Sequence, residues 1–420
     1  MSRPDNACDV LVVGAGPAGL AAAYRAAQAG RRVIVVDDNP DAGGQIWRGE
    51  QREPRSHEAQ VWFERLRSVD IEYHAAARVF QRIEPGKLLA ETAGGVCELV
   101  FENLILATGA RERFLPFPGW TLPNVIGAGG LQALVKNGLP IDGKKVVISG
   151  SGPLLLAVAG YLRSHGAEIL LIAEQASSLR LARFGFGLAG KSAQVFALRK
   201  QLKRVRYLRD CWVVAAHGEE KLERVTFQRT GKRSTLSCDY LACGFHLVPN
   251  LELAELLGCD IRDAAVRVDE FQQTSVSRVY SAGESTGIGG LELSLVEGEI
   301  AGLAAAGHRE ESRRLFPERA KQRRFADLLN RTFALRNELK TLAAPDTIVC
   351  RCEDVVFERL RAHDSWRAAK LQTRCGMGPC QGRICGSAVE FLFGWKAESV
   401  RPPILPVRVE SLLTTELSKL

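Results

Sequence analysis

The chain has 420 residues, 46% of them hydrophobic, and a formal net charge of +8. This length predicts two or three domains, and the composition is ordinary for a globular protein with substantial cores. The polar amino-terminal stretch argues against a secretory signal peptide, and the lack of an apolar run of about 20 residues argues against an integral membrane segment. We therefore expect a cytoplasmic protein, with peripheral association with the inner membrane as an open alternative.

Basic side chains concentrate in residues 199–209 and 309–340. Both stretches interleave charges with apolar residues, as solvated helix faces do. Nucleic-acid binding would need aromatic platforms or a recognisable module, and the sequence offers neither. We expect no nucleic acid, and interpret the two stretches as solvated helix faces or as a docking face for an acidic partner protein.

Residues 9–38 predict a dinucleotide-binding fold. An apolar strand at 10–13 meets the turn GAGPAG, an alanine-rich helix follows, and a second apolar strand at 33–36 ends in acid, which is the context that the fingerprint requires. Gly16 would let the backbone approach a pyrophosphate at the positive end of the helix. Asp37 would accept hydrogen bonds from the adenosine ribose. The nucleotide-binding residues predicted here are Gly14, Gly16, Pro17, Ala18, Gly19 and Asp37.

Three further stretches have turn or strand character. DAGGQIWR at 41–48 contains two adjacent glycines, and its spacing alone predicts a turn. LILATGA at 104–110 predicts a buried strand that ends in a glycine turn. RVYSAGESTGIGG at 278–290 predicts a strand followed by the start of a helix, which continues through 291–306 as an apolar helix broken by small residues.

Residues 146–174 repeat the design of the first fold. Gly150 and Gly152 match the first two glycines of the fingerprint, whereas Leu155 replaces the third. Glu174 ends the following strand, where an acid would hold ribose hydroxyls and disfavour the 2′-phosphate of NADP. Two interpretations stay open. Gly150, Gly152 and Glu174 form a site for NAD or another adenine nucleotide, or the fold keeps its shape and has lost or changed its ligand.

Five cysteines crowd into VCRCED at 349–354 and TRCGMGPCQGRIC at 373–385. Disulfides are rare in the reducing cytosol, and thiolates are soft ligands that favour zinc or iron–sulfur clusters. A C-x-C pair is unusual for structural zinc, which prefers C-x2–4-C. We predict a two-iron two-sulfur (2Fe-2S) cluster, with zinc or free thiols as the alternative, and Cys375 stays open as a further ligand. The predicted cluster ligands are Cys350, Cys352, Cys380 and Cys385.

The motifs GAGPAG, GGQIWR, AGESTGIGG, VCRCED and GMGPCQGRIC together resemble the alpha (A) subunits of bacterial multi-subunit amine dehydrogenases, over essentially the whole chain. This family includes D-hydroxyproline dehydrogenase, the octopine and nopaline (opine) oxidases and hydrogen cyanide synthase. Its members are two-dinucleotide-binding-domain flavoproteins, related to thioredoxin and glutathione reductases, with a bacterioferritin-associated-ferredoxin-like (BFD-like) domain. In that family the four predicted cluster ligands match the cluster cysteines.

The resemblance implies an α/β fold with two Rossmann-like dinucleotide-binding domains, one inserted in the other, and a small C-terminal BFD-like iron–sulfur domain. The expected boundaries are 1–115 with 245–310 for the FAD-binding domain, 116–244 for the second, NAD-like domain, 311–345 for a helical linker and 346–420 for the BFD-like domain with its tail. The resemblance also adds further loop residues to the predicted FAD contacts, with Glu284 standing where the family has Asp and reaching the ribityl chain. These residues are Gly43, Gly44, Gln45, Thr108, Gly109, Gly283 and Glu284.

The resemblance also implies a hetero-oligomer in which a D-amino-acid-oxidase-like beta subunit oxidises the amine or imino acid. This chain would receive the electrons. Two further components stay open, namely a small ferredoxin-like gamma subunit and an FMN shared between this chain and the beta subunit.

Thioredoxin and glutathione reductases use a redox dithiol that this sequence lacks at the corresponding position. Cys238 and Cys243 fall instead in a predicted strand and its exit turn. The scattered histidines form no convincing acid/base pair. Two alternatives remain, namely an NADH-dependent FAD/iron–sulfur reductase and a non-catalytic scaffold that holds cofactors.

Overall fold

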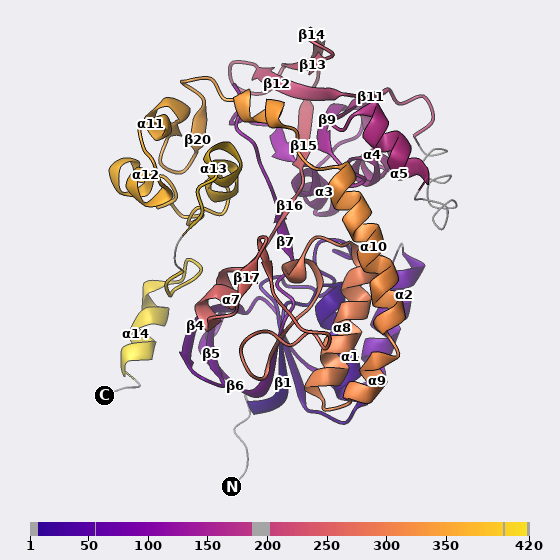
Figure 1. The fold of residues 1–420 in the computed structure, drawn as a ribbon, viewed down its shortest axis with the longest axis vertical. Helices are drawn as coiled ribbons and strands as arrows, with labels where there is room; N and C mark the ends of the chain where they lie inside the picture. Colours follow the sequence, from indigo (N-terminus) through magenta and orange to yellow (C-terminus); the bar gives the residue numbers. More distant parts are fainter. Residues whose placement is uncertain (1–6, 55, 187–201, 398–399, 418–420) are drawn as a thin grey trace. The chain divides into compact units, whose positions relative to one another are not determined.

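The computed structural model describes residues 7–54, 56–186, 202–397 and 400–417, so that residues 199–201 of the first basic stretch lie outside it. The chain divides into two compact units, each assembled from separate segments (Figure 1). The first unit comprises Met1–Arg111, Pro249–Ala326 and Ser399–Leu420, and the second unit comprises Glu112–Val248 and Asp327–Glu398. The chain passes between the units four times, and three of these passages fall within β7 (Ala110–Glu112), β16 (Leu247–Pro249) and α10 (Phe316–Thr332).

A seven-stranded sheet forms the centre of the first unit, in the order β3-β2-β1-β6-β5-β4 with β19 beside β6. Its strands are β1 (Ala7–Val13), β2 (Val33–Val36), β3 (Glu72–His74), β4 (Arg78–Glu84), β5 (Lys87–Thr92), β6 (Gly95–Leu106) and β19 (Val279–Ser281). The strands β3, β2, β1, β6 and β19 are parallel, and β4 to β6 are antiparallel. The register pairs Val13 with Val36, so the turn after β1 lies beside the residue that follows β2.

Two helices pack closely in the first unit, α1 (Pro17–Gln28) and α8 (Leu291–Ala305), which lie side by side in Figure 1. Small residues make the approach possible. A Cβ on Gly298 would lie 2.1 Å from the carbonyl oxygen of Ala18, and one on Gly302 would lie 2.3 Å from that of Ala22. The alanine-rich sequence of α1 and the glycines of α8 therefore serve one purpose, which is close helix packing on the sheet.

The carboxy-terminal tail returns to the first unit. The backbone N–H of Ile404 donates to the carbonyl of Phe80 in β4 at 2.9 Å, and Ser411 in α14 (Val409–Leu417) donates to Glu91 at 2.6 Å. The tail therefore covers the antiparallel side of the sheet. The remaining elements of this unit are α2 (His57–Arg67), α7 (Glu252–Leu257), β17 (Ile261–Arg262), β18 (Ala265–Val266), η2 (Gly283–Thr286) and α9 (Arg309–Arg313).

A five-stranded parallel sheet in the order β11-β10-β9-β15-β8 forms the core of the second unit. Its strands are β8 (Val125–Gly127), β9 (Lys145–Ser151), β10 (Glu168–Glu174), β11 (Tyr207–Arg209) and β15 (Tyr240–Phe245), and its helices are α3 (Ala128–Lys136), α4 (Leu154–Ser164) and α5 (Ser178–Phe186). Leu155, which replaces the third glycine of the fingerprint, is fully buried against Gly244. The glycine thus lies on β15 instead of α4, and the helix still packs on the sheet.

Two smaller parts complete the second unit. An antiparallel sheet consists of β12 (Cys211–His217), β13 (Arg224–Arg229) and β14 (Lys232–Ser237). The cysteine module consists of β20 (Ile348–Cys350), β21 (Val355–Val356), α11 (Phe357–Arg361), α12 (Trp366–Thr373) and α13 (Cys385–Phe393), and it follows η3 (Asn337–Thr341). The indole N–H of Trp120 donates to the carbonyl of Ile348, which ties the module to the unit's core. Among the described residues, no helix has the length and apolar character needed to cross a membrane.

Candidate functional site

The turn between β1 and α1 has the geometry of a dinucleotide site. Gly14 has a φ of 106°, and a Cβ there would lie 2.2 Å from the carbonyl oxygen of Ala107. Gly16 is the N-cap of α1 and Pro17 opens the helix, so no side chain caps its first turn. Backbone N–H groups at such a helix start favour phosphate groups. Ala18 and Gly19 follow in this first turn, as the sequence predicts.

Asp37 lies beside this turn and is buried. One carboxylate oxygen accepts the backbone N–H of Ala15 at 2.5 Å, and the other accepts the backbone N–H of Asn39 at 2.7 Å. These bonds fix the carboxylate at the end of β2, where the sequence predicts a ribose contact.

The glycine pair of the GGQIWR motif closes on the same turn. The backbone N–H of Gly43 donates to the carbonyl of Ala15 at 2.8 Å, and a Cβ on Gly44 would lie 2.9 Å from the Cα of Gly16. Gln45 follows in the same loop with an exposed side chain. The structure thus brings Gly43 and Gly44 to the turn between β1 and α1, whereas the role of Gln45 stays a prediction.

Thr108 and Gly109 are held in place by Asn250. The Thr108 hydroxyl donates to the Asn250 carbonyl at 2.7 Å, the Asn250 amide donates to the Thr108 carbonyl at 2.8 Å, and the Asn250 backbone N–H donates to Gly109 at 3.0 Å. This reciprocal set fixes the end of β6 next to Gly14. Asn250 is absent from the residues predicted from the sequence, because its role depends on a contact 142 positions away along the chain.

The turn Gly283–Thr286 carries Glu284, the predicted ribityl contact. Its carboxylate accepts the backbone N–H groups of Gly289 at 3.2 Å and Gly290 at 2.9 Å. Burial raises the pKa of Glu284 to about 7, although these two bonds oppose the rise. Both carboxylate oxygens therefore support the loop before α8, and a contact with the ribityl chain stays a prediction.

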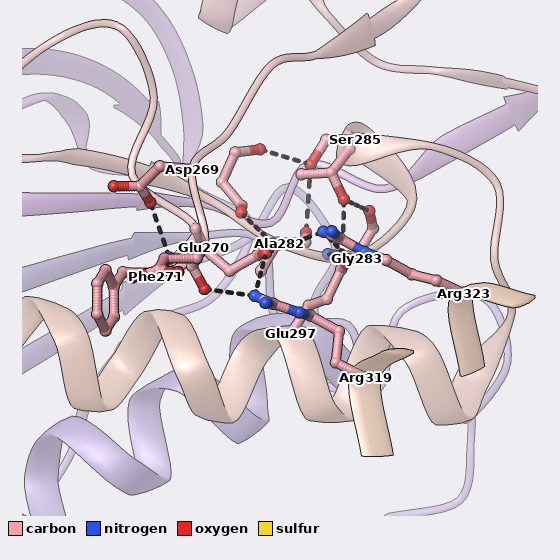
Figure 2. A network of polar contacts seen from close by, with 12 residues as sticks. Asp269, Glu270, Phe271, Ala282, Gly283, Ser285, Glu297, Arg319 and Arg323 are labelled. Atoms are coloured by element: carbon pink, nitrogen blue, oxygen red, sulfur yellow. Dashed lines mark hydrogen bonds and ion pairs between the residues drawn. The ribbon is translucent and has the colours of Figure 1, made fainter. Parts of the chain in front are cut away.

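A buried carboxylate behind this turn is missing from the residues predicted from the sequence (Figure 2). Glu297 in α8 accepts the backbone N–H of Gly283 at 3.2 Å and the hydroxyl of Thr286 at 2.7 Å. Its other oxygen accepts Arg323 at 2.9 Å, and Arg323 also donates to Gln272 at 3.2 Å. The sequence signal is weak, because Glu297 is one of three acids in this helix, and only its burial, which requires partners for the charge, sets it apart.

The cysteine module gathers five thiols. The Sγ atoms of Cys350, Cys375 and Cys385 all lie within 4.8 Å of one another, and these three side chains are buried. Hydrogen bonds from the Cys375 and Cys385 thiols, with the backbone N–H of Gly376, lower the pKa of Cys350. A thiolate at this position suits a metal, because metals bind the deprotonated form.

Cys352 and Cys380 form the outer part of the same nest. Cys352 is exposed and hydrogen-bonds with Cys380, which is partly exposed. The two predicted pairs therefore meet in one region, and Cys375, which the sequence leaves open, lies with the buried members. The donor set of soft sulfur atoms fits an iron–sulfur cluster or zinc.

The second nucleotide fold places its acid as the first fold does. Glu174 is buried, and its two oxygens accept the backbone N–H groups of Gly152 and Ala176, both at 2.8 Å. Burial raises the pKa of Glu174 to about 7. Gly150 has a φ of 152° and lies against Gly244, so this turn also needs glycine.

Comparisons with known proteins agree with this geometry. Residues 8–306 match the family described as pyridine nucleotide-disulphide oxidoreductase. The chain is 30% identical to the A subunit of opine oxidase from Rhizobium meliloti, over 96% of this chain and 87% of that protein. It is 32% identical to hydrogen cyanide synthase subunit HcnB of Pseudomonas aeruginosa, over 89% of this chain and 90% of that protein.

A solved structure shares the fold over nearly the whole length. L-proline dehydrogenase from P. horikoshii superposes with a TM-score of 0.67 and 19% identity, covering 97% of this chain and 79% of that chain. Thioredoxin reductase from T. acidophilum matches with a TM-score of 0.57 and 20% identity, over 72% of this chain and 99% of that chain. The residues around Gly14, Asp37 and Thr108 fit an FAD. The chain belongs to the pyridine nucleotide-disulphide oxidoreductase family, together with the A subunit of opine oxidase and hydrogen cyanide synthase subunit HcnB, and is an FAD-dependent electron-transfer oxidoreductase subunit.

Proposed function

We propose that this chain is the electron-transfer subunit of a multi-subunit dehydrogenase or oxidase that acts on C–N bonds of amino or imino acids. The substrate class is that of D-hydroxyproline, proline or an opine. The observation that carries the proposal is the combination, in one chain, of a turn fitted to FAD and a nest of five thiols. The names of the relatives support it, because the A subunit of opine oxidase and hydrogen cyanide synthase subunit HcnB are each one subunit of a larger enzyme.

The proposed partner is a D-amino-acid-oxidase-like beta subunit that oxidises the substrate. A small ferredoxin-like gamma subunit, with an FMN at the junction to the beta subunit, completes the proposed assembly, which we place in the cytoplasm. Bound FAD and an iron–sulfur cluster would supply the conversion between two-electron and one-electron steps. The chain's own contribution is to bind and orient. Helix α1 presents backbone N–H groups to phosphates, and Asp37 presents a carboxylate to the ribose.

We propose that the thiol nest holds a 2Fe-2S cluster through Cys350, Cys352, Cys380 and Cys385. Backbone N–H groups of Gly376 and Glu353 point to the sulfur of Cys350, and such hydrogen bonds help to tune a cluster's potential. Cys375 is the competing ligand, because its sulfur lies with those of Cys350 and Cys385.

The electron donor is tested with the protein co-purified with its partner chain under anaerobic conditions. We expect proline, D-hydroxyproline or an opine to bleach the flavin of the complex, and none of them to bleach the isolated chain. The variant Asp37→Ala should lose FAD, whereas Asp38→Ala should keep it because Asp38 pairs with Arg78 at the surface. Rapid bleaching of the isolated chain by NADH would contradict the proposal.

The cluster is tested by measuring iron and acid-labile sulfide in the same preparations. We expect equal amounts of both in the native chain and a loss of both in Cys350→Ser and Cys385→Ser. Cys97→Ser, far from the nest in sequence, is the control that should keep them. If Cys375→Ser keeps its iron and sulfide, the four proposed ligands are supported. If it loses them, Cys375 is a ligand in place of one of the four. Zinc without sulfide would overturn the cluster and leave the FAD assignment standing.

A further inference from the structure

A short segment of the chain, residues 333–336, lies on the glycine turn of the second nucleotide fold. It follows α10 directly and leads to the cysteine module. The hydroxyl of Ser151 donates to the carbonyl of Phe333 at 2.9 Å. The ring of Phe333 lies 3.9 Å from the position that a Cβ on Gly152 would take, and only 4% of this residue is exposed.

The segment continues along the end of β10. The side-chain amide of Gln175 donates to Ser151 at 2.7 Å and to the carbonyl of Ala334 at 3.3 Å. The amide oxygen of Gln175 accepts the backbone N–H of Arg336 at 3.2 Å. Gln175 is itself buried, and its side-chain amide bonds both to Ser151 and to the segment.

Further contacts hold both flanks of the segment. Phe184 packs edge-on against Phe333, with ring centroids 5.2 Å apart. Arg180 donates to the carbonyl of Ala334 at 3.0 Å. The guanidinium of Arg336 lies 4.4 Å from the ring centroid of Trp212. Buried aromatic packing and several hydrogen bonds therefore fix residues 333–336 in this position.

In a doubly wound fold, a dinucleotide lies in the crevice at the carboxyl ends of the strands, with its pyrophosphate at the second glycine of the turn. The ribose lies at the acid that ends the second strand. Phe333 lies against Gly152, where the pyrophosphate would bind. Ala334 accepts a hydrogen bond from Gln175, the residue after Glu174, and so lies near the expected place of the ribose. The segment thus follows the path that the ADP half of NAD would take.

The first nucleotide fold supplies an internal comparison. The carboxylates of Asp37 and Glu174 are hydrogen-bonded alike. Each accepts one backbone N–H from its glycine turn and one from the residue two positions after the acid itself. The difference is what lies on the turn. Gly44, which has no side chain, approaches Gly16, whereas the phenyl ring of Phe333 covers Gly152.

A cavity of about 320 Å³ remains beside the segment, lined by residues 335–338 together with Gln175, Ser177 and Arg180. This volume is at the small end of ligand pockets, and the residues of the turn, Gly150 to Gly152, do not contribute to its lining. Among the described residues, the lining of this cavity therefore does not extend to the glycine turn.

We propose that residues 333–336 occupy the dinucleotide path of the second fold, so that this fold holds the linker to the cysteine module in place of NAD(H). Phe333 and Gln175 are the residues that specify this exclusion. The chain is then closed to nicotinamide donors by its own sequence, and electrons reach it by another route. The inference concerns the second fold alone and would stand if the thiol nest held zinc.

The test is binding of NAD⁺ and NADH to the full FAD-loaded chain by equilibrium dialysis. We expect no saturable binding to the native protein. In the double variant F333A/Q175A, which removes the ring over Gly152 and the amide that tethers the segment, we expect affinity for NADH to rise at least tenfold. Leu179→Ala, an exposed residue of the neighbouring α5, is the control and should bind as little as the native chain. Binding to the native chain, or to neither protein when the double variant is folded, would overturn the proposal.

Hydrogen exchange of the native chain decides the question if the double variant does not fold. We expect excess NADH to leave the exchange of residues 150–156 and 333–338 unchanged. Protection of residues 150–156 by NADH, together with faster exchange across 333–338, would mean that the nucleotide displaces the segment, and the closed site would be refuted.

Discussion

At the residue scale, Glu297 links the core to the turn that carries Gly283 and Glu284. Its carboxylate is almost fully buried, whereas its partner Arg323 retains 41% exposure of the side chain. The pair therefore contributes less through charge attraction than through the buried bond to Gly283 and the partly buried bond to Thr286. Glu297 therefore positions the turn through Gly283 and Thr286.

We expect Glu297→Ala to lower the free energy of unfolding of the flavin-free chain by about 2–4 kcal/mol, because two donors and part of a buried ion pair lose their acceptor. FAD affinity should fall together with stability. Glu299→Ala, two residues along the same helix, breaks a pair with Arg25 whose carboxylate is more exposed than that of Glu297. This change leaves the bonds to the turn in place and should cost less than about 1 kcal/mol. Denaturant titration and FAD titration measure the two effects. Equal costs for the two variants would contradict the role of Glu297.

Glu174 makes stability depend on pH. Its pKa is raised from 4.5 to about 7 by burial, so the folded chain holds this proton more tightly than the unfolded chain does. The associated stability is fully present below the unfolded pKa and is lost as pH rises through about 7. Since one unit of pKa corresponds to about 1.4 kcal/mol, the loss reaches at most about 3 kcal/mol.

We expect Glu174→Gln to flatten this decline between about pH 4 and about pH 8, because the amide does not titrate. Glu168→Gln changes the exposed residue at the other end of the same strand and should keep the native slope. Denaturant titrations of the flavin-free protein across this range provide the measurement. Parallel curves for the native chain and Glu174→Gln would show that the buried carboxyl does not carry the dependence.

At the scale of elements, the contact of α1 with α8 depends on two glycines. We expect Gly302→Ala to lower the free energy of unfolding by about 1–3 kcal/mol, because the added methyl meets the carbonyl of Ala22 in a packed core. Gly185→Ala in α5 is the matched change, since its added methyl meets nothing within 4 Å and alanine favours a helix. The thermal unfolding temperature should fall for Gly302→Ala and should stay the same or rise for Gly185→Ala.

Local motifs predict their elements because each works through neighbours in sequence. GAGPAG predicts a strand, a turn and a helix start, which the structure confirms for β1 and α1. The two cysteine pairs meet in space because β20 and the start of α13 pack in one small core. Long-range placements could not be predicted. The position of Phe333 on Gly152, the return of Ile404 to Phe80 and the gathering of Cys375 with Cys350 each depend on how separate elements pack.

At the scale of the whole molecule, the tail belongs to the first unit although the cysteine module precedes it in the chain. We expect removal of residues 400–420 to lower the stability of the first unit, because Ile404 is buried there and Glu91 loses Arg408 and Ser411. Thermal release of flavin should shift to lower temperature, whereas iron content should stay unchanged. The single change Ser411→Ala should reproduce a small part of the shift. Loss of iron on truncation would contradict this division.

The interleaved course of the chain has a consequence for synthesis on the ribosome. The second unit ends at Glu398, while the first unit needs Ser399–Leu420. Domains generally fold during translation in order from the amino terminus. Here the unit that begins first is completed last, so a chain that ends before residue 399 would contain the whole cysteine module and a first unit still missing its final segment.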